Sequence, residues 1–342
     1  MVGGKVLLEV TDLKQYFPIK KGVLGRVSNY VKAVDGISFK VHEGETVSIV
    51  GESGCGKSTT GRTILRLENP TGGEIIFDGV DLATLSKREM RKKRKDIQII
   101  FQDPYASLNP KQTVYQILNE SMAIQGIGES GKRRERIKTL LQTVGLQEHQ
   151  IDLYPHQFSG GQRQRIGIAR ALSVRPKLIV CDEAVSALDV SIRAQVLNLL
   201  KDLQHDFKLT YLFISHDLGV VRHISDRIIV MYLGKIMEVS DKEALFEHPG
   251  HPYTYALLSS IPSTNLDKKK ERIILTGDVP SPINPPGGCP FHTRCPLAID
   301  KCKTDIPPYI TLGETEFEGI SACHLVHDGK LDYARELKHS TV

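Results

Sequence analysis

The stretch Gly51-Glu52-Ser53-Gly54-Cys55-Gly56-Lys57-Ser58-Thr59 has the form G-x-x-x-x-G-K-S. An apolar run at 46–50 precedes it and a helix-like segment at 58–67 follows, which is the strand, glycine loop and helix order of a phosphate-binding P-loop. Glycines let the backbone curl so that successive N–H groups point inward, and the helix N-terminus adds a partial positive charge. Lys57 can then reach the β- and γ-phosphates of a nucleoside triphosphate, and Ser58 can ligate Mg²⁺.

The length and composition indicate an ordinary globular protein. At 342 residues the chain is long enough for two domains, and 40% hydrophobic and 25% charged residues are typical values. The net charge of +5 weakly favours an acidic partner surface or a membrane face. No apolar run reaches the roughly 18 residues of a membrane helix, and the N-terminus lacks a signal-peptide stretch. We therefore expect a cytoplasmic chain, unless a partner holds it at a membrane.

The pattern of apolar and polar residues predicts strands alternating with helices. Residues 20–32 are polar and are expected to form a hairpin loop. We expect strands at 7–10, 33–39, 46–50, 72–79, 178–181 and 211–214, and amphipathic helices at 113–149, 162–174 and 192–207. Strand-then-helix alternation predicts an α/β sheet with helices on both faces and ligands at its carboxyl edge.

The run at 87–95 is strongly basic. It could be a patch for nucleic acid or lipid headgroups, or it could be the solvated face of a helix. The second interpretation is favoured, because no aromatic residues interleave to stack on bases. We expect no nucleic-acid partner.

Two further motifs carry chemistry. Apolar residues 178–181 lead into Asp182 and Glu183; in a P-loop protein the first such acid holds Mg²⁺ and the second can orient the attacking water. Two acids after a strand can also cap a helix, and only the upstream P-loop favours the hydrolytic interpretation. Upstream of them, Ser159-Gly160-Gly161-Gln162 begins a helix, so its exposed N–H groups offer a second anion-binding position.

In order and spacing these motifs resemble the complete set of an ABC-type ATPase. In the family's terms they are Walker A (Gly51–Thr59), Q-loop (Gln102), signature (Ser159–Gln162), Walker B (Leu178–Glu183), D-loop (Ser186–Asp189) and H-loop (His216). The resemblance covers residues 5 to about 245. It implies a RecA-like core, an antiparallel β subdomain and an α-helical subdomain.

The resemblance also implies the role of each residue. In the family two ATP-binding domains dimerise head-to-tail, and each ATP lies between the P-loop of one and the signature of the other. On the chain's own ATP, Lys57 is expected to bind the phosphates, and Mg²⁺ is expected to be held by Ser58, Gln102 and Asp182. Glu183 is expected to act as the general base, and His216 is expected to contact the γ-phosphate. Ser159, Gly160, Gly161 and Gln162 are expected to meet the partner's ATP, and Asp189 to couple the two sites.

Adenine is expected to stack on an aromatic residue upstream of Walker A. Phe17 fits best, with Tyr16 next. Two positions depart from the common family pattern: Phe158 stands where Leu is commoner, and Ala184-Val185 stands where many relatives have Pro-Thr or Ala-Thr. Both leave the hydrolytic residues intact, and an apolar residue can pack at Phe158 in either case.

The amino-acid composition changes after about residue 248, where prolines become frequent. His251–Thr254, residues 277–291, Arg294-Cys295-Pro296 and Cys323-His324 resemble the C-terminal extension of oligopeptide/dipeptide permease ATPases, and the chain is most similar to the F-type subunit. We therefore expect an ATPase domain at 5–248 and a small, loop-rich extension at 249–330.

Four cysteines of this extension, Cys289, Cys295, Cys302 and Cys323, are spaced C-x5-C-x6-C-x20-C. Structural zinc sites usually have closer pairs, so the spacing suits a four-cysteine iron–sulfur cluster better. A 4Fe–4S cluster is also what the resemblance implies, while zinc and metal-free thiols are the alternatives. Cys55 and Cys181 are expected to be structural.

The resemblance implies an ATP-hydrolysing subunit of an importer for di- or oligopeptides, located at the cytoplasmic face of the membrane. Its expected partners are a paralogous ATPase subunit in a heterodimer, two membrane permease subunits and an extracytoplasmic peptide-binding protein. A nickel or sugar importer is an alternative. Another alternative is a non-transport ABC protein acting on ribosomes or DNA. It is disfavoured because such proteins usually carry two ATP-binding domains or a long coiled coil, whereas this sequence has one set of motifs and no heptad insertion. A non-hydrolytic structural partner needs a degenerate site, whereas Lys57, Glu183 and His216 are all present.

Overall fold

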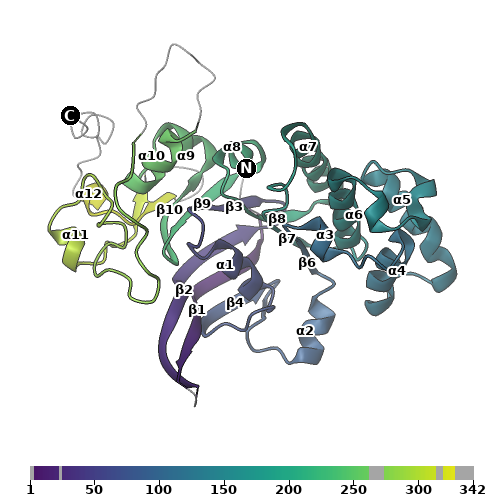
Figure 1. Cartoon of the computed structure of the whole chain (residues 1–342), viewed down its shortest axis with the longest axis horizontal. Helices are drawn as coiled ribbons and strands as arrows, with labels where there is room; N and C mark the ends of the chain where they lie inside the picture. The colour runs from purple at the N-terminus through teal and green to yellow at the C-terminus, as the bar shows by residue number, and fades with distance from the viewer. Residues whose placement is uncertain (1–3, 23–24, 262–272, 313–318, 328–342) are drawn as a thin grey trace, which may run out of the picture. The chain divides into compact units, whose positions relative to one another are not determined.

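The computed structural model describes residues 4–22, 25–261, 273–312 and 319–327 (Figure 1). Its contacts divide the chain into two compact units. The first is drawn from residues 1–40, 47–83 and 215–342, and the second from 41–46 and 84–214. Within the described ranges no helix combines the length and the apolar character that crossing a membrane requires. The boundary expected between 248 and 249 stays a prediction.

The first unit contains a four-stranded antiparallel sheet in the order β2-β1-β4-β5. Its strands are β1 (Val6–Lys21), β2 (Arg26–His42), β4 (Gly72–Phe77) and β5 (Val80–Asp81). The expected hairpin loop at 20–32 is wrong, since β1 and β2 continue as a long ribbon to Lys21 and from Arg26 (Figure 1). Backbone hydrogen bonds do not depend on side-chain polarity, so a polar segment can still form strands.

Five further strands of this unit are neighbours in the order β11-β12-β10-β9-β3. Strand β3 is parallel to β9, and β9 is antiparallel to β10, which pairs with β12. The strands are β3 (Thr46–Val50), β9 (Arg227–Tyr232), β10 (Lys235–Asp241), β11 (Ile310–Leu312) and β12 (Gly319–Ser321). The helices are α1 (Lys57–Ile64), α8 (Leu218–Ile224), α9 (Lys242–Glu247), α10 (Pro252–Ser259), α11 (Lys301–Thr304) and α12 (His324–His327).

The second unit contains the parallel strands β8-β7-β6 and most of the helices. The strands are β6 (Ile97–Ile100), β7 (Leu178–Asp182) and β8 (Thr210–Ile214). The α-helices are α2 (Lys87–Lys93), α3 (Pro104–Ser107), α4 (Val114–Ile124), α5 (Arg133–Thr143), α6 (Gly160–Leu172) and α7 (Val190–Phe207). The 3-10 helices are η1 (Ser130–Lys132), η2 (Glu148–Asp152) and η3 (Pro155–Gln157).

Burial explains why these strands carry functional groups at their ends. All five residues of β7 and of β8 are buried, as expected for parallel strands covered on both faces. The carboxyl ends of β6 and β7 meet at one edge, because Ile100 pairs with Cys181. Gln102 follows the first strand and Asp182 ends the second.

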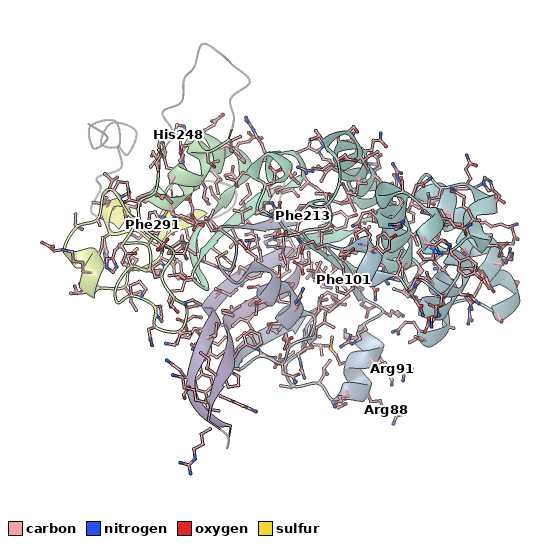
Figure 2. All side chains as sticks on the ribbon, in the orientation of Figure 1. Arg88, Arg91, Phe101, Phe213, His248 and Phe291 are labelled. Carbon is pink, nitrogen blue, oxygen red and sulfur yellow. The ribbon has the colours of Figure 1, made fainter. Side chains whose placement is uncertain are left out.

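The basic run at 87–95 forms α2 and the turn after it. Met90 is the one buried residue of the helix, while Arg88 and Arg91 project into solvent (Figure 2). A capping box between Ser86 and Glu89 begins the helix. The arrangement is that of a solvated helix face.

Candidate functional site

The P-loop lies in the first unit between β3 and α1. Its glycines are required by the backbone: Gly51 has φ of 150° and Gly56 has φ of 104°. A Cβ atom at Gly51 would lie 2.2 Å from the Met231 carbonyl oxygen, and one at Gly56 would lie 2.1 Å from that of Ala33. Only glycine fits either position. No side chain caps the N-terminus of α1, which leaves its first N–H groups suited to an anion.

Lys57 is folded back over the loop. Its Nζ donates to the carbonyl oxygens of Gly51 (2.9 Å) and Glu52 (2.8 Å), and the side chain is 4% exposed. Cys55 is buried beside it, and burial raises the pKa of the Cys55 thiol, so this cysteine is a neutral packing residue. A cationic head held by carbonyl oxygens at the mouth of a glycine loop can bind phosphate oxygens.

His216 lies in the same unit as the P-loop. The Ser215 N–H donates to the carbonyl oxygen of Ile49 at 3.1 Å, so His216 follows a residue that is bonded to β3 just before the loop. Its side chain is exposed. The structure therefore brings this histidine to the strand that leads into Walker A.

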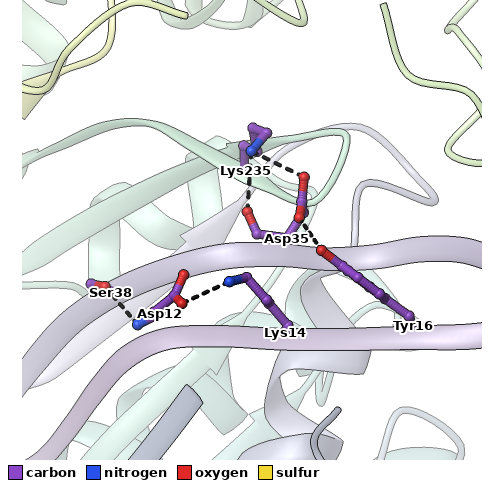
Figure 3. Close-up of polar contacts among 6 residues, drawn as sticks. All are labelled: Asp12, Lys14, Tyr16, Asp35, Ser38 and Lys235. Carbon is purple, nitrogen blue, oxygen red and sulfur yellow. Dashed lines mark hydrogen bonds and ion pairs between the residues drawn. The ribbon is translucent and has the colours of Figure 1, made fainter. Parts of the chain in front are cut away.

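The two candidate aromatic residues for adenine have different surroundings. Successive side chains of a strand point to opposite faces, so Tyr16 and Phe17 cannot both meet one base. The Tyr16 hydroxyl donates to the carboxylate of Asp35, which Lys235 holds at 3.0 Å (Figure 3). Burial and the bond to Asp35 raise the pKa of Tyr16, which stays neutral. Phe17 is half-buried. Which of them meets adenine stays a prediction.

The acids of Walker B lie in the second unit. Asp182 ends β7 and is 3% exposed. Glu183 follows with φ of 49°, a conformation uncommon for a residue other than glycine, and its N–H donates to the Ile214 carbonyl oxygen at 3.0 Å. The Gln102 side-chain amide donates to the Glu183 carboxylate at 2.9 Å. The Q-loop amide and the Walker B carboxylate are thus in direct contact, while the roles expected of Gln102 at Mg²⁺ and of Glu183 as general base stay predictions.

The signature begins α6 with a capping box. Ser159 Oγ accepts from the Gln162 N–H at 3.3 Å, and the Gln162 side chain accepts from the Ser159 N–H at 3.0 Å. Ser159 and Gly160 are exposed, while Phe158 is 3% exposed and fills the core as expected. The exposed helix start is accessible to a group from outside this chain.

The first turn of α7, which follows the D-loop, lies against the signature. Gly161 packs so closely on Ile192 that a Cβ atom there would lie 2.4 Å from the Ile192 Cγ2. Asp189 is exposed at the start of α7, and the next residue, Val190, is 79% exposed. Both motifs therefore occupy one surface of the second unit.

Sequence reasoning missed two residues that support the P-loop. The Glu52 N–H donates to the Tyr253 hydroxyl at 2.9 Å, and Arg294 pairs with the Glu52 carboxylate at 2.7 Å. The segments containing Tyr253 and Arg294 identify the subfamily, but nothing in their spacing indicates a role for either residue. The sequence did contain a signal, Glu52, because an acid within a P-loop requires a cation nearby.

Three features are typical of the ATP-binding cassettes of ABC transporters. They are the glycine-rich P-loop, the contact between the Gln102 amide and the Glu183 carboxylate, and the exposed start of α6 capped by Ser159. The family model described as "ABC transporter" matches residues 34–186, and the one described as "Oligopeptide/dipeptide transporter, C-terminal region" matches 237–302. The chain belongs to the family of oligopeptide and dipeptide transport ATP-binding proteins, and it is an ABC-type ATPase.

Individual relatives agree with this assignment. The oligopeptide transport ATP-binding protein AppF of Bacillus subtilis is 56% identical over 94% of this chain and 98% of its own length. The dipeptide transport ATP-binding protein DppF of Escherichia coli is 50% identical over 89% and 90%. The cassette MJ0796, solved as a dimer bound to ADP and Pi, has a TM-score of 0.61 at 30% identity and covers 69% of this chain and 99% of its own.

The predicted 4Fe–4S cluster is wrong. Within residues 4–22, 25–261, 273–312 and 319–327, no group of three or more His, Cys, Asp or Glu side chains is placed to hold a metal ion, which also removes the zinc alternative. Burial raises the pKa of Cys289 and of Cys295 to about 12. The cavity at the four cysteines measures only about 10 Å³.

The cysteines serve as packing residues in this structure. Cys289 and Cys302 belong to an apolar cluster with Tyr253 and Phe291, and the Cys289 N–H donates to the Cys302 carbonyl oxygen at 2.9 Å. Cys323 packs with Leu325 and neighbouring apolar residues. A small, buried thiol behaves as an apolar side chain, which is why spacing alone misidentified the site.

Proposed function

We propose that this chain binds and hydrolyses ATP to drive the import of di- or oligopeptides through separate membrane subunits. The observation that carries the proposal is the intact P-loop of a chain that is similar to oligopeptide and dipeptide transport ATP-binding proteins over nearly their whole length. The matching C-terminal region supports a peptide cargo. The alternative cargoes, nickel and sugars, have no observation in their favour.

The proposed chemistry is positioning and charge stabilisation. The P-loop N–H groups and the N-terminus of α1 bind the phosphates, and Lys57 exchanges two carbonyl oxygens for phosphate oxygens. Mg²⁺, when bound, neutralises phosphate charge. The hydroxyl of Ser58, the amide of Gln102 and the carboxylate of Asp182 are the oxygen donors this ion takes. Glu183 orients the attacking water, and His216 contacts the γ-phosphate.

The proposed assembly contains two ATP-binding chains. The exposed Ser159-Gly160 start of α6 meets ATP held by the other chain, and the exposed Asp189 lies at the same junction. The second chain is a paralogue, and two permease subunits and an extracytoplasmic peptide-binding protein complete the importer. The chain is then held at the cytoplasmic face of the membrane, without a nucleic-acid partner.

The Glu183→Gln variant tests the proposal. The variant keeps the side-chain size but removes the carboxylate that orients water, so hydrolysis should fall about a hundredfold or more while the Kd for ATP stays within about twofold. Hydrolysis is measured on the transporter isolated from native membranes through a tag on this chain. Uptake of a labelled dipeptide should be lost in cells that carry the variant, with Ni²⁺ uptake unchanged.

The control is Glu129→Gln, which removes an exposed carboxylate of the second unit. It should match the parent in both assays. Parent-like hydrolysis by Glu183→Gln would rule out Glu183 as the catalytic acid. If the variant loses Ni²⁺ uptake but keeps peptide uptake, the cargo is nickel and not a peptide.

A further inference from the structure

The P-loop carries a negative charge of its own at Glu52. Its carboxylate pairs with Arg294 Nη1 at 2.7 Å, across 242 residues of sequence. The arginine side chain is 9% exposed and the glutamate side chain 25%. Both residues belong to the first unit, and Arg294 lies beyond the ABC transporter match at 34–186, in the C-terminal region match.

The charge of Glu52 opposes the function of the loop. A glycine loop attracts phosphate through N–H groups, whereas an unpaired carboxylate beside it repels the three to four negative charges of a triphosphate. Burial works to lower the pKa of Arg294, but its bond to the Glu52 carboxylate and the nearby Tyr232 hydroxyl hold that pKa above its usual range. Arg294 is therefore always charged and neutralises Glu52 at any physiological pH.

The aromatic core holds Arg294 in place. The backbone N–H of Arg294 donates to the Phe291 carbonyl oxygen at 3.0 Å. The Phe291 ring lies 5.4 Å from that of Tyr232 and 5.1 Å from that of Tyr253, and Tyr253 in turn accepts from the Glu52 N–H. Because these rings are buried together, the guanidinium has little freedom to leave the carboxylate.

We propose that Arg294 sets the affinity of the P-loop for ATP by neutralising Glu52, which makes the C-terminal region a working part of the nucleotide site. Arg294 is a positioning and neutralising residue, and it takes no part in the hydrolytic step. The inference rests on the proposed function, since it concerns the same site.

The test is the Kd for Mg-ATP of the full chain, measured for Arg294→Gln. Leaving Glu52 unpaired should raise the Kd about tenfold, and higher ionic strength should recover part of the loss because the repulsion is screened. The rate of hydrolysis at saturating ATP in the assembled transporter should stay within about twofold of the parent, because the chemical groups are unchanged.

A double variant distinguishes neutralisation of the Glu52 charge from a purely structural role of Arg294. Glu52→Gln combined with Arg294→Gln removes both charges and should return the Kd to within about twofold of the parent. Lys303→Gln removes a positive charge from an exposed position in the same region and should leave the Kd unchanged. Arg294→Lys keeps the charge and should bind nearly as tightly as the parent.

Three outcomes overturn the inference. A folded Arg294→Gln chain with parental Kd removes any role for Arg294, and a double variant no better than the single one removes neutralisation. If Arg294→Gln does not fold, Glu52→Gln alone carries the test: it leaves a positive charge beside the loop and should tighten binding, so weaker binding overturns the proposal. A parent chain that binds no ATP overturns the proposed function itself.

Discussion

At the scale of single residues, Glu238 of β10 is a buried acid whose charge opposes folding. The side chain is fully buried, and Oε1 accepts from the Gly250 N–H at 2.7 Å. His251 and Thr254 face it, and burial lowers the pKa of His251 to about 3, so this histidine supplies no positive charge to balance the carboxylate. Burial raises the pKa of Glu238 to about 7.

The consequence is a pH-dependent stability. Since the folded pKa lies above the unfolded value, the contribution of Glu238 is complete below pH about 4.5 and is lost as the pH rises through about 7. Glu238→Gln should therefore stabilise the chain relative to the parent by about 2–3 kcal/mol more at pH 8 than at pH 5. Urea unfolding at both pH values measures this difference, and Glu247→Gln, at an exposed position, should show none. A difference that is constant with pH would contradict the assignment.

At the scale of elements, α6 contains two glycines with opposite surroundings. Gly161 packs against Ile192 of α7, whereas a Cβ atom at Gly167 meets no atom within 4 Å. The first glycine permits the signature and the first turn of α7 to lie side by side. The second costs the helix conformational entropy with no packing benefit.

The two alanine variants should therefore differ in sign. Gly161→Ala forces Ile192 to move and should lower the free energy of unfolding by about 1–3 kcal/mol. Gly167→Ala should raise it by about 0.5–1 kcal/mol through helix propensity. Thermal unfolding of the full chain measures both. Equal effects of the two substitutions would show that packing of Gly161 on Ile192 does not matter.

At the scale of the whole molecule, we expect a second chain to complete the proposed site. Ser159, Gly160 and Asp189 are exposed, and so is the apolar side chain of Val190. An exposed apolar group at the start of a helix, beside two exposed motifs, suits burial against a partner.

The purified chain alone should be largely monomeric and weakly active. With its paralogue and Mg-ATP, the Glu183→Gln variant should form a stable two-chain complex, because ATP that is not hydrolysed keeps the dimer closed. Size-exclusion chromatography with light scattering measures the mass. Lys57→Ala, which weakens ATP binding, is the control and should stay monomeric. Strong hydrolysis by the isolated monomer would contradict the two-chain site.

Much of the candidate site follows from local sequence. The P-loop, the acids at the end of β7 and the serine cap of α6 depend on glycine conformations, strand ends and helix caps, which neighbouring residues specify. The long β1–β2 ribbon was missed because its backbone ladder needs no apolar pattern. The iron–sulfur prediction was wrong because spacing does not indicate whether thiols point at a metal or pack in a core.

The sequence by itself determined the class of protein, the order of its motifs and the residues expected at ATP, because each motif is a short segment with its own backbone requirement. Only the tertiary structure decided that Arg294 neutralises Glu52, that Tyr253 holds the P-loop backbone and that Asp35 holds Tyr16. Such pairs join residues far apart in the chain, and their energies depend on burial and on distances of about 3 Å, which no local pattern encodes.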